Sequence, residues 1–587
     1  MTGANRLGRA VVVAAVLFTV ACGRRGAAGA AAVPAAAPVT ASSAVSISAD
    51  ARLLEMVDQR RPDTALVDRL LADTSAARRA RTALAIGQAR IRLRYPRLRA
   101  LLVDGDTAIA ANAAYAIGIA RDYEAVPSLA RAVMGAPDAV AREAAWALGE
   151  VGEMGREAIV SALGNGAPNA VTRSPVAARA PAVRAALVLA TFKLREAPIA
   201  AVTPWLQDPA PEVVRAAAYV VARLRAPAGV RALFAVAAYN DEEVRQYAAR
   251  AFARSAAGDS LGGRAREALR ILLRDESERV RINAAQSAAS YGPLMADAVD
   301  SLWNDPARNV RVALAEAYAE AAGRDAARWQ RAWDADTLLA VRRALLSHLR
   351  RSQLPLVAGV EAEWAGRADW RYRVAALGGG DPGSMLDSAL ARRLLADADP
   401  RVRREARARL GERDTTVSAR PPRSSVPIPR ALEEYERLVE RYWRTPTRPR
   451  AFIDTDQGTI TIELFAHDAP LVVEAFTRLA REGKYRNTIF HRVVPNFVVQ
   501  DGDIAGGDGA PEPPFSLRES WSRRRHGRGC LGLATAGPDT GGSQYYLCHS
   551  TQPHLDGGYT VFGQVVDGFD VMDRIVRGDR MLQVRVP

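Results

Sequence analysis

The feature that most constrains the fold is an internal repeat between about residues 50 and 413. The residues of this stretch follow a helical pattern of apolar positions, broken by short polar turns. A motif of the type x-V-R-x-A-A recurs within it, with its arginine at Arg142, Arg184, Arg215, Arg245, Arg281, Arg311, Arg342, Arg373 and Arg403. Most steps between copies are 30 or 31 residues. A period of this length predicts a stacked array of helices.

Aspartates occupy the turns before these helices. The turns concerned begin at Asp208, Asp241, Asp275, Asp305 and Asp399. An aspartate here is expected to cap the helix that follows and to place a negative charge on its first turn. We expect the repeated arginine to be structural and to contact an aspartate of a neighbouring repeat; a row of ligand-binding arginines is the alternative.

The pattern resembles short HEAT repeats. Such an array presents a long curved face made of equivalent positions, which suits protein binding better than catalysis. The resemblance therefore implies protein partners on the face of the solenoid.

The first residues are typical of an export signal. Arg6 and Arg9 precede an apolar run from Ala10 to Ala21, which is too short to span a bilayer. Cys22 follows small Ala21, and this arrangement is similar to a bacterial lipoprotein signal, although Thr19 leaves ordinary cleavage open. We expect a signal peptide at 1–21, lipidation of Cys22 and a flexible tether at 22–48.

This signal also bears on location and partners. Lipidation would anchor the chain to the membrane at the periplasmic face of the envelope. Gly23 stands where an aspartate would favour the inner membrane, so the outer membrane is favoured. The formal charge is +15, carried almost wholly by arginine. We interpret that bias as genomic background, and export argues against nucleic-acid binding.

The chain changes character after the repeats. We place the helical array at 49–413 and a proline-rich linker with one amphipathic helix, Ala431 to Trp443, at 414–447. Residues 448–587 instead carry short strand patterns and glycine-rich turns.

Three motifs in this last part carry chemistry. Phe490 to Gln500 reads F-H-R-V-V-P-N-F-V-V-Q, Leu533 to Leu547 reads L-A-T-A-G-P-D-T-G-G-S-Q-Y-Y-L, and His554 to Gly563 reads H-L-D-G-G-Y-T-V-F-G. Together with T-I-T-I-E-L-F from Thr459 and the A-P-x-x-V-x-A-F segment from Ala469, they resemble the cyclophilin family of peptidyl-prolyl isomerases. The resemblance implies a closed antiparallel β-barrel with capping helices, so the whole chain is expected to be multidomain, an all-α HEAT-like solenoid followed by this barrel.

The resemblance also implies the site. The catalytic residues would be Arg492, Phe497 and Gln500, and the substrate-binding residues Val498, Ala534, Thr535, Gln544, Tyr546, His554, Leu555 and Tyr559. Two of these depart from the family pattern: His554 replaces a tryptophan or phenylalanine, and Thr535 replaces an asparagine. No cofactor is implied. The six histidines are scattered and no C-x-x-C occurs, so no metal site is expected.

Some residues are expected to have structural roles. Strand alternation turns His491 away from Arg492, and Ser543 lacks the G-x-S-x-G setting of a nucleophile. Cys530 and Cys548 flank a predicted hairpin, where they would form either a disulfide or two buried thiols.

The sequence therefore predicts a peptidyl-prolyl cis-trans isomerase that assists the folding of exported proteins. Its clients would be proline-containing polypeptides, and its helical array would bind clients or partners. The alternative is a non-catalytic scaffold of the cell envelope, whose barrel only grips a proline-containing partner.

Overall fold

The structure is a computed structural model that describes residues 41–167, 169–352, 356–378, 388–411, 430–444, 448–504 and 515–587. The predicted signal peptide, Cys22 and nearly all of the proline-rich linker lie outside the described residues. Val45 to Pro587 form one compact unit. Within the described ranges, no helix combines the length and the apolar character needed to cross a bilayer.

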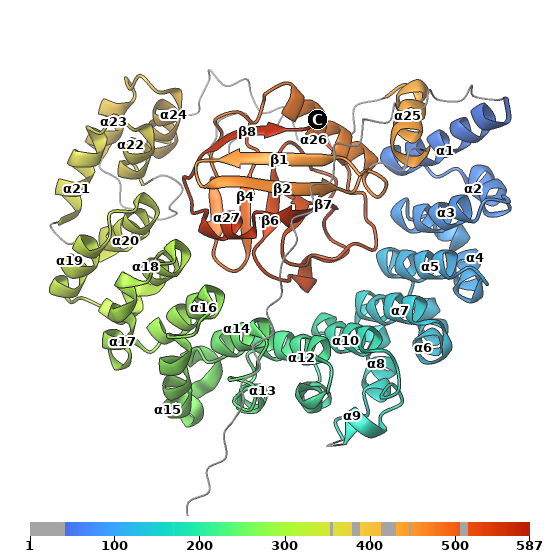
Figure 1. The fold of residues 1–587 in the computed structure, drawn as a ribbon, viewed down its shortest axis with the longest axis horizontal. Helices are drawn as coiled ribbons and strands as arrows, with labels where there is room; N and C mark the ends of the chain where they lie inside the picture. The colour runs from blue at the N-terminus through green and yellow to red at the C-terminus, as the bar shows by residue number, and fades with distance from the viewer. Residues whose placement is uncertain are drawn as a thin grey trace, which may run out of the picture. The chain divides into compact units, whose positions relative to one another are not determined.

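The repeats form a row of helices that pack side by side in chain order (Figure 1). This row consists of α3 (Ala76–Gln88), α5 (Thr107–Ala120), α7 (Asp138–Glu150), α10 (Pro181–Ala190), α12 (Pro211–Leu224), α14 (Glu242–Ala251), α16 (Glu278–Ala289), α18 (Arg308–Ala322), α20 (Leu339–Ser352), α22 (Trp370–Ala376) and α24 (Pro400–Arg409). Alanines such as Ala217, Ala285 and Ala313 are fully buried between neighbours. Small side chains let the helix backbones approach closely, so the row is tightly packed.

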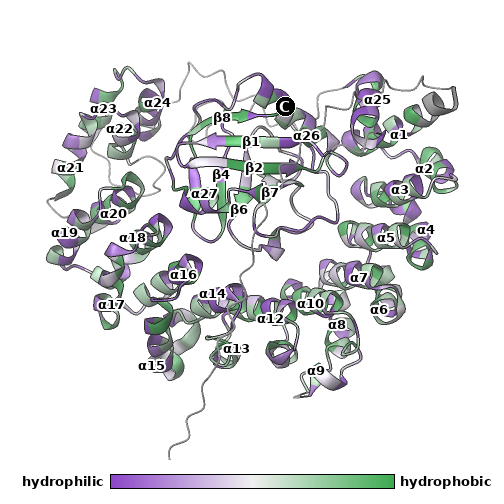
Figure 2. Ribbon diagram, in the orientation of Figure 1, coloured by the Kyte–Doolittle hydropathy of each residue, from purple (hydrophilic) through white to green (hydrophobic). Residues whose placement is uncertain are grey.

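Further helices connect the members of this row. They are α1 (Ala41–Gln59), α2 (Thr64–Leu71), α4 (Tyr95–Ala100), α6 (Val126–Gly135), α8 (Arg156–Ala162), α9 (Ala170–Arg173), α11 (Ile199–Val202), α13 (Pro227–Leu233), α15 (Arg254–Leu272), α17 (Ala296–Asp300), α19 (Ala326–Ala335), α21 (Leu356–Ala365) and α23 (Ser388–Leu394). Figure 2 shows hydrophobic and hydrophilic residues together along these helices, as expected for helices with one buried face. Helix α1 begins at Ala41, so the end of the predicted tether is helical.

The expected contact with an aspartate of the next repeat is confirmed for six of the nine repeated arginines, and it is partly exposed at Arg215. Arg142 instead pairs with Glu143, and Arg342 and Arg403 donate to the backbone oxygens of Asp336 and Asp397. The remaining five have well-buried partners. The pairs are Arg184–Asp208 at 2.9 Å, Arg245–Asp275 at 2.7 Å, Arg281–Asp305 at 2.7 Å, Arg311–Asp336 at 2.6 Å and Arg373–Asp397 at 2.7 Å. Several of these contacts are bidentate, with Nε and Nη2 donating to the two carboxylate oxygens. We call these five pairs the arginine ladder.

The capping prediction was right for two aspartates and wrong for three. Asp241 and Asp399 cap α14 and α24. Asp208, Asp275 and Asp305 instead lie two residues before the cap and accept the backbone N–H of residues 210, 277 and 307. Their carboxylates already bind the ladder arginines, which holds them outside the helix.

The C-terminal part contains an antiparallel sheet in the order β3-β4-β6-β5-β7-β2-β1-β8. Its strands are β1 (Arg450–Thr455), β2 (Gly458–Leu464), β3 (Arg492–Val494), β4 (Val498–Asp501), β5 (Cys530–Leu533), β6 (Tyr545–Cys548), β7 (Val561–Asp567) and β8 (Met581–Arg585). The segments beside its two outer strands meet, because Ile489 bridges Arg580 and Met581 N donates to Thr488 O. The sheet is therefore curled.

Two helices accompany the sheet, α26 (Pro470–Arg481) and α27 (Phe569–Arg574). The T-I-T-I-E-L-F segment falls on β2. β1 precedes it and pairs with it through alternating buried positions.

The predicted amphipathic helix, observed as α25 (Leu432–Val439), contacts both parts of the molecule. Tyr435 donates to Asp58 of α1 at 2.7 Å, and Tyr442, just after the helix, donates to Glu474 of α26 at 2.7 Å. Ala51 and Leu54 of α1 belong to the same hydrophobic cluster as the sheet core. This helix thus joins the first repeat to the sheet.

Candidate active site

The candidate catalytic arginine lies on the hairpin of β3 and β4. Arg492 pairs directly with Gln500 in the antiparallel register, and such partners place their side chains on the same face. The turn between them is tight because Asn496 adopts a left-handed backbone conformation, φ 60°, which asparagine tolerates well. The hairpin therefore brings the arginine and the glutamine together.

The Arg492 guanidinium is held between two of its predicted partners. Nη1 donates to Gln500 Oε1 at 3.3 Å, and Cζ lies 5.5 Å from the centroid of the Phe497 ring. The side chain keeps an exposed surface, yet burial of the guanidinium lowers the pKa of Arg492 from its usual value. A guanidinium stays protonated at any physiological pH, so Arg492 is a cationic donor beside an aromatic ring.

Two apolar residues of the same motif lie away from Arg492. Phe490 and Val493 are buried in the core of the sheet. For Val493 the reason is strand alternation, because successive residues of β3 face opposite sides.

A chain of amides fixes Gln500. Its Nε2 donates to Gln544 Oε1 at 2.9 Å, and Gln544 O in turn accepts from Ala534 N at 3.0 Å. Gln544 is buried. Because the amide nitrogen of Gln500 donates to Gln544, the amide oxygen of Gln500 faces Arg492. The strands that hold these two glutamines therefore orient the guanidinium.

An apolar cluster lies beside these polar groups. Val498, Ala534, Tyr546 and Leu555 are buried in it, with Phe497 and Tyr559 half-buried at its edge. His554 stacks on the Phe497 ring, with centroids 5.6 Å apart and planes 25° apart. Thr535 follows Ala534 and is half-buried. The structure thus gathers the predicted pocket residues in one place, next to Arg492.

Three residues that the sequence did not single out hold Tyr546 in this cluster. Its hydroxyl lies 2.9 Å from His526 Nε2, and His526 Nδ1 lies 2.9 Å from Asp556 Oδ1. Gly532 faces the tyrosine across β5 and β6, where a Cβ would come within 2.3 Å of the ring. Only glycine fits there. Of these three residues, only Asp556 could have been noticed in the sequence, because it directly follows the predicted pocket residue Leu555.

The residues expected to be structural are buried. His491 and Ser543 have little exposed surface, and Ser543 O accepts from the Tyr485 hydroxyl. Cys530 and Cys548 are two buried thiols with sulfurs 3.3 Å apart. Their strands pair with each other, with Leu531 opposite Leu547.

The turn of the β3–β4 hairpin rests on the helical region. Asn496 Nδ2 donates to Arg279 O at 2.6 Å and to Asn283 Oδ1 at 3.0 Å, both on α16. The turn beside the candidate catalytic arginine is therefore fixed from outside the sheet.

The segment after β6 is held in the same way. Thr551 Oγ1 donates to Glu243 Oε1 of α14 at 2.8 Å, and His554 Nδ1 lies 3.2 Å from the Tyr219 hydroxyl of α12. Burial and the nearby cations, Arg223 foremost, lower the pKa of His554 to about 4. The imidazole is therefore neutral at physiological pH.

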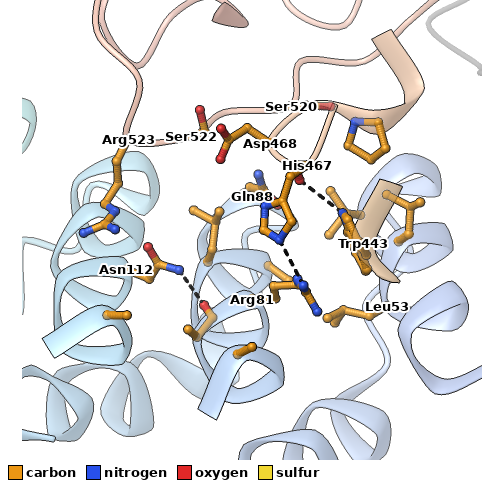
Figure 3. Close-up of a pocket in the computed structure, with 18 of the residues that line it drawn as sticks. Leu53, Arg81, Gln88, Asn112, Trp443, His467, Asp468, Ser520, Ser522 and Arg523 are labelled. Carbon is orange, nitrogen blue, oxygen red and sulfur yellow. Dashed lines mark hydrogen bonds between the residues drawn. The ribbon is translucent and has the colours of Figure 1, made fainter. Parts of the chain in front are cut away.

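A separate cavity of about 470 Å³ lies near α26 and the first helices (Figure 3). Arg81 Nη2 lies 3.0 Å from His467 Nε2, and its guanidinium stacks 4.6 Å from the Trp443 ring. None of the predicted site residues lines this cavity. It therefore plays no part in the candidate active site.

Comparison with known proteins matches the C-terminal part. Residues 451–586 match the family described as cyclophilin type peptidyl-prolyl cis-trans isomerase/CLD. A peptidyl-prolyl cis-trans isomerase of Helicobacter pylori strain J99 is 46% identical over 132 residues, which are 22% of this chain and 82% of that protein. Peptidyl-prolyl cis-trans isomerase B of Bacillus subtilis strain 168 is 42% identical over 136 residues, or 23% and 95%. A Cryptosporidium parvum cyclophilin crystal structure, determined in the presence of the dipeptide Ala-Pro, is 27% identical with a TM-score of 0.22 and covers 24% of this chain and 98% of that chain.

Proposed function

The chain belongs to the cyclophilin-type peptidyl-prolyl cis-trans isomerase family, and from this premise we propose that it isomerises prolyl bonds in proteins that fold after export. One observation supports the assignment of the site above all others. The Arg492 guanidinium is held by Gln500 over the Phe497 ring, beside an apolar cluster that suits a prolyl ring.

A prolyl bond isomerises slowly because rotation breaks the amide resonance, with a barrier of about 18 to 20 kcal/mol. In the twisted transition state the prolyl nitrogen regains a lone pair. A donor directed at this nitrogen binds the transition state more strongly than either planar ground state, which is the condition for raising the rate. Arg492 is the donor in this scheme.

One hydrogen bond does not supply the whole effect. An acceleration of about five decades requires about 7 kcal/mol, whereas a charge-assisted hydrogen bond contributes about 1.5 to 3 kcal/mol. We assign the remainder to the pocket, where Val498, Tyr546 and Leu555 hold the prolyl ring while the preceding carbonyl turns. Ala534, Thr535 and Gln544 would hold the peptide backbone. Neutral His554 adds no charge to this apolar wall.

The test is a prolyl isomerisation assay on the full-length chain. Arg492→Ala is expected to lower kcat/KM about a hundredfold, the upper end of what one charge-assisted bond supplies. Arg486→Ala is the matched control, because Arg486 is exposed on the same domain and has no ion pair among the described residues. A wild type no faster than Arg492→Ala would leave the non-catalytic scaffold as the function.

For the helical region we propose a HEAT-like solenoid that positions clients or partners at a closed cyclophilin-like barrel. The contacts of α12, α14 and α16 with the turns beside the site support this role. Without these contacts, the turn of the β3–β4 hairpin and the segment after β6 would be more mobile. The prediction is tested by Asn283→Ala, which removes one acceptor from the Asn496 amide and is expected to weaken peptide binding more than turnover.

We also propose that the chain is exported and anchored by a lipid at Cys22, on the periplasmic face of the outer membrane. The charged start, the short apolar run and the cysteine after Ala21 support this location. Metabolic labelling with a fatty acid tests it. Label on the wild type but not on Cys22→Ala is expected; an unlabelled wild type would refute the anchor.

A further inference from the structure

A cavity of about 450 Å³ adjoins the proline pocket on the side of the helical region. Its sheet-side wall includes Pro495, Phe497 and His554, and its opposite wall comes from α12, α14 and α16. Phe497 and His554 also belong to the predicted peptide site. A peptide with its prolyl ring in the apolar cluster therefore has neighbouring residues within reach of this cavity.

The charged residues among those that line the cavity are all arginines. Arg223, Arg225 and Arg250 lie in its wall, and none of its lining residues is aspartate or glutamate. None of these three guanidiniums has an ion pair within the part of the chain that the structure describes. Burial and the two neighbouring arginines lower the pKa of Arg250, which shows that the charges act on one another.

These arginines differ from those of the ladder, each of which binds an aspartate of the next repeat. Arg223 and Arg250 do stand in the last turns of α12 and α14, where a cation stabilises the helix dipole. The dipole effect falls off within one turn. It accounts for an arginine at each helix end, but it does not account for arginines of neighbouring helices that line the same cavity. Arg223, Arg225 and Arg250 are exposed and solvated, and together they give the cavity a positive field that attracts an anion.

A second observation points to a ligand. Gln246 lines the same cavity with only 2% of its surface exposed, and its Oε1 has no hydrogen-bond partner among the described residues. Buried amide oxygens are nearly always satisfied. A backbone N–H of a bound peptide would satisfy this one. The cavity thus offers cations for a carboxylate and an acceptor for a main chain.

We propose that this cavity binds an acidic residue of the client, aspartate or glutamate, close to the isomerised proline. The inference rests on the proposed function, since it names the clients of the same site. It assigns to the helical region a direct part in substrate choice. Arg223 and Arg250 are the residues that would contact the carboxylate.

The experiment compares two peptides with the full-length chain. They differ only in glutamate or glutamine beside the proline, and both kcat/KM and the dissociation constant are measured, the latter by fluorescence anisotropy. A charge-assisted contact predicts about a tenfold preference for the glutamate peptide. The preference should shrink as salt is raised and as pH falls below about 4, where glutamate becomes protonated.

The double variant Arg223→Gln/Arg250→Gln is expected to abolish this preference and to leave the glutamine peptide unaffected. Arg231→Gln is the control, because Arg231 is exposed on α13 and outside the cavity. Equal constants for both peptides with the wild type, or a preference that survives the double variant, would overturn the inference. If neither peptide is turned over, the proposed isomerase activity fails, and the ratio of dissociation constants still decides whether the cavity selects acidic residues.

Discussion

Arginines in two regions of this molecule have opposite surroundings. In the ladder, a guanidinium such as that of Arg184 is buried against a carboxylate and binds both of its oxygens. At the candidate active site and its adjoining cavity, Arg492, Arg223 and Arg250 have no carboxylate partner in the described residues. Composition alone does not distinguish the two sets.

The difference separates structural from functional roles. A buried arginine that binds an aspartate is neutralised, and removing one partner leaves an uncompensated charge, which is strongly destabilising. An unpaired, exposed arginine keeps its field and its donors for a ligand. The ladder residues should therefore affect folding and not turnover, while the unpaired residues should do the reverse.

The largest effect is expected when the ladder is broken. Arg184→Ala leaves Asp208 with 1% of its side chain exposed and no counter-charge, so the free energy of unfolding should fall by about 3 kcal/mol. Urea unfolding of the full-length chain, followed by circular dichroism, measures this change. The kcat/KM on a short peptide should stay within about twofold of wild type, as expected for a change that leaves transition-state contacts intact.

Arg215→Ala is the control for that variant. Arg215 pairs with Asp241 at 3.2 Å, but 41% of its side chain is exposed, and exposed pairs contribute less than about 1 kcal/mol. If both variants lose the same free energy of unfolding, burial of the ion pair does not matter, and the contrast between buried and exposed arginines would be wrong.

The next effect concerns a buried carboxylate without a cation. Asp501 is fully buried, accepts from Thr488 Oγ1 at 3.1 Å and from Gly502 N, and burial raises its pKa from 3.8 to about 8. The folded chain keeps this proton up to about pH 8, whereas the unfolded chain loses it above about pH 4. The free energy of unfolding should therefore fall by at least about 1 kcal/mol as pH rises through this window.

Asp501→Asn should remove that decline, and exposed Asp567→Asn should not. Unfolding in urea at several values between pH 4 and 8 measures the slope. A slope that survives Asp501→Asn would show that another group causes it.

Much of this organisation could be predicted from the sequence. The period of the repeat indicated the row of helices, because each unit buries the same face. The pocket residues from Arg492 to Tyr559 could be named because three motifs kept the family spacing. Strand register then placed Arg492 opposite Gln500.

The contacts between the helical region and the sheet could not be predicted. Asn496 and Asn283 are 213 positions apart, and no periodicity relates a turn of the sheet to a helix of the repeat. For the same reason the sequence does not distinguish Arg223 from any other arginine at the end of a surface helix. Asp208, Asp275 and Asp305 were wrongly predicted to cap helices, because each binds an arginine of the preceding repeat and the sequence does not show this contact.

A smaller effect is expected when the amide that holds the proposed catalytic arginine is removed. Gln500→Leu keeps the volume of the side chain but leaves Arg492 without its acceptor at 3.3 Å. The guanidinium keeps its charge and loses its orientation, so kcat/KM should fall about tenfold, the cost of misplacing one such donor. Peptide turnover measures this, and urea unfolding should show little change. A loss as large as that of Arg492→Ala would mean that Gln500 itself contacts the substrate.

The smallest effect concerns His554, which faces the unpaired arginines and has a pKa of about 4. In the unfolded chain its pKa returns to about 6.5. Stability from the neutral imidazole is therefore complete above pH 6.5 and is lost as pH falls through about 4. His554→Phe keeps a ring against Phe497 and should flatten the stability curve in this window, with little change in kcat/KM at pH 7. Arg223→Gln removes the cation that lowers this pKa most, so the loss should become smaller and end at a higher pH. If Arg223→Gln leaves the curve unchanged, the arginines do not act on the imidazole, and the contrast between paired and unpaired arginines would not extend to the pocket wall.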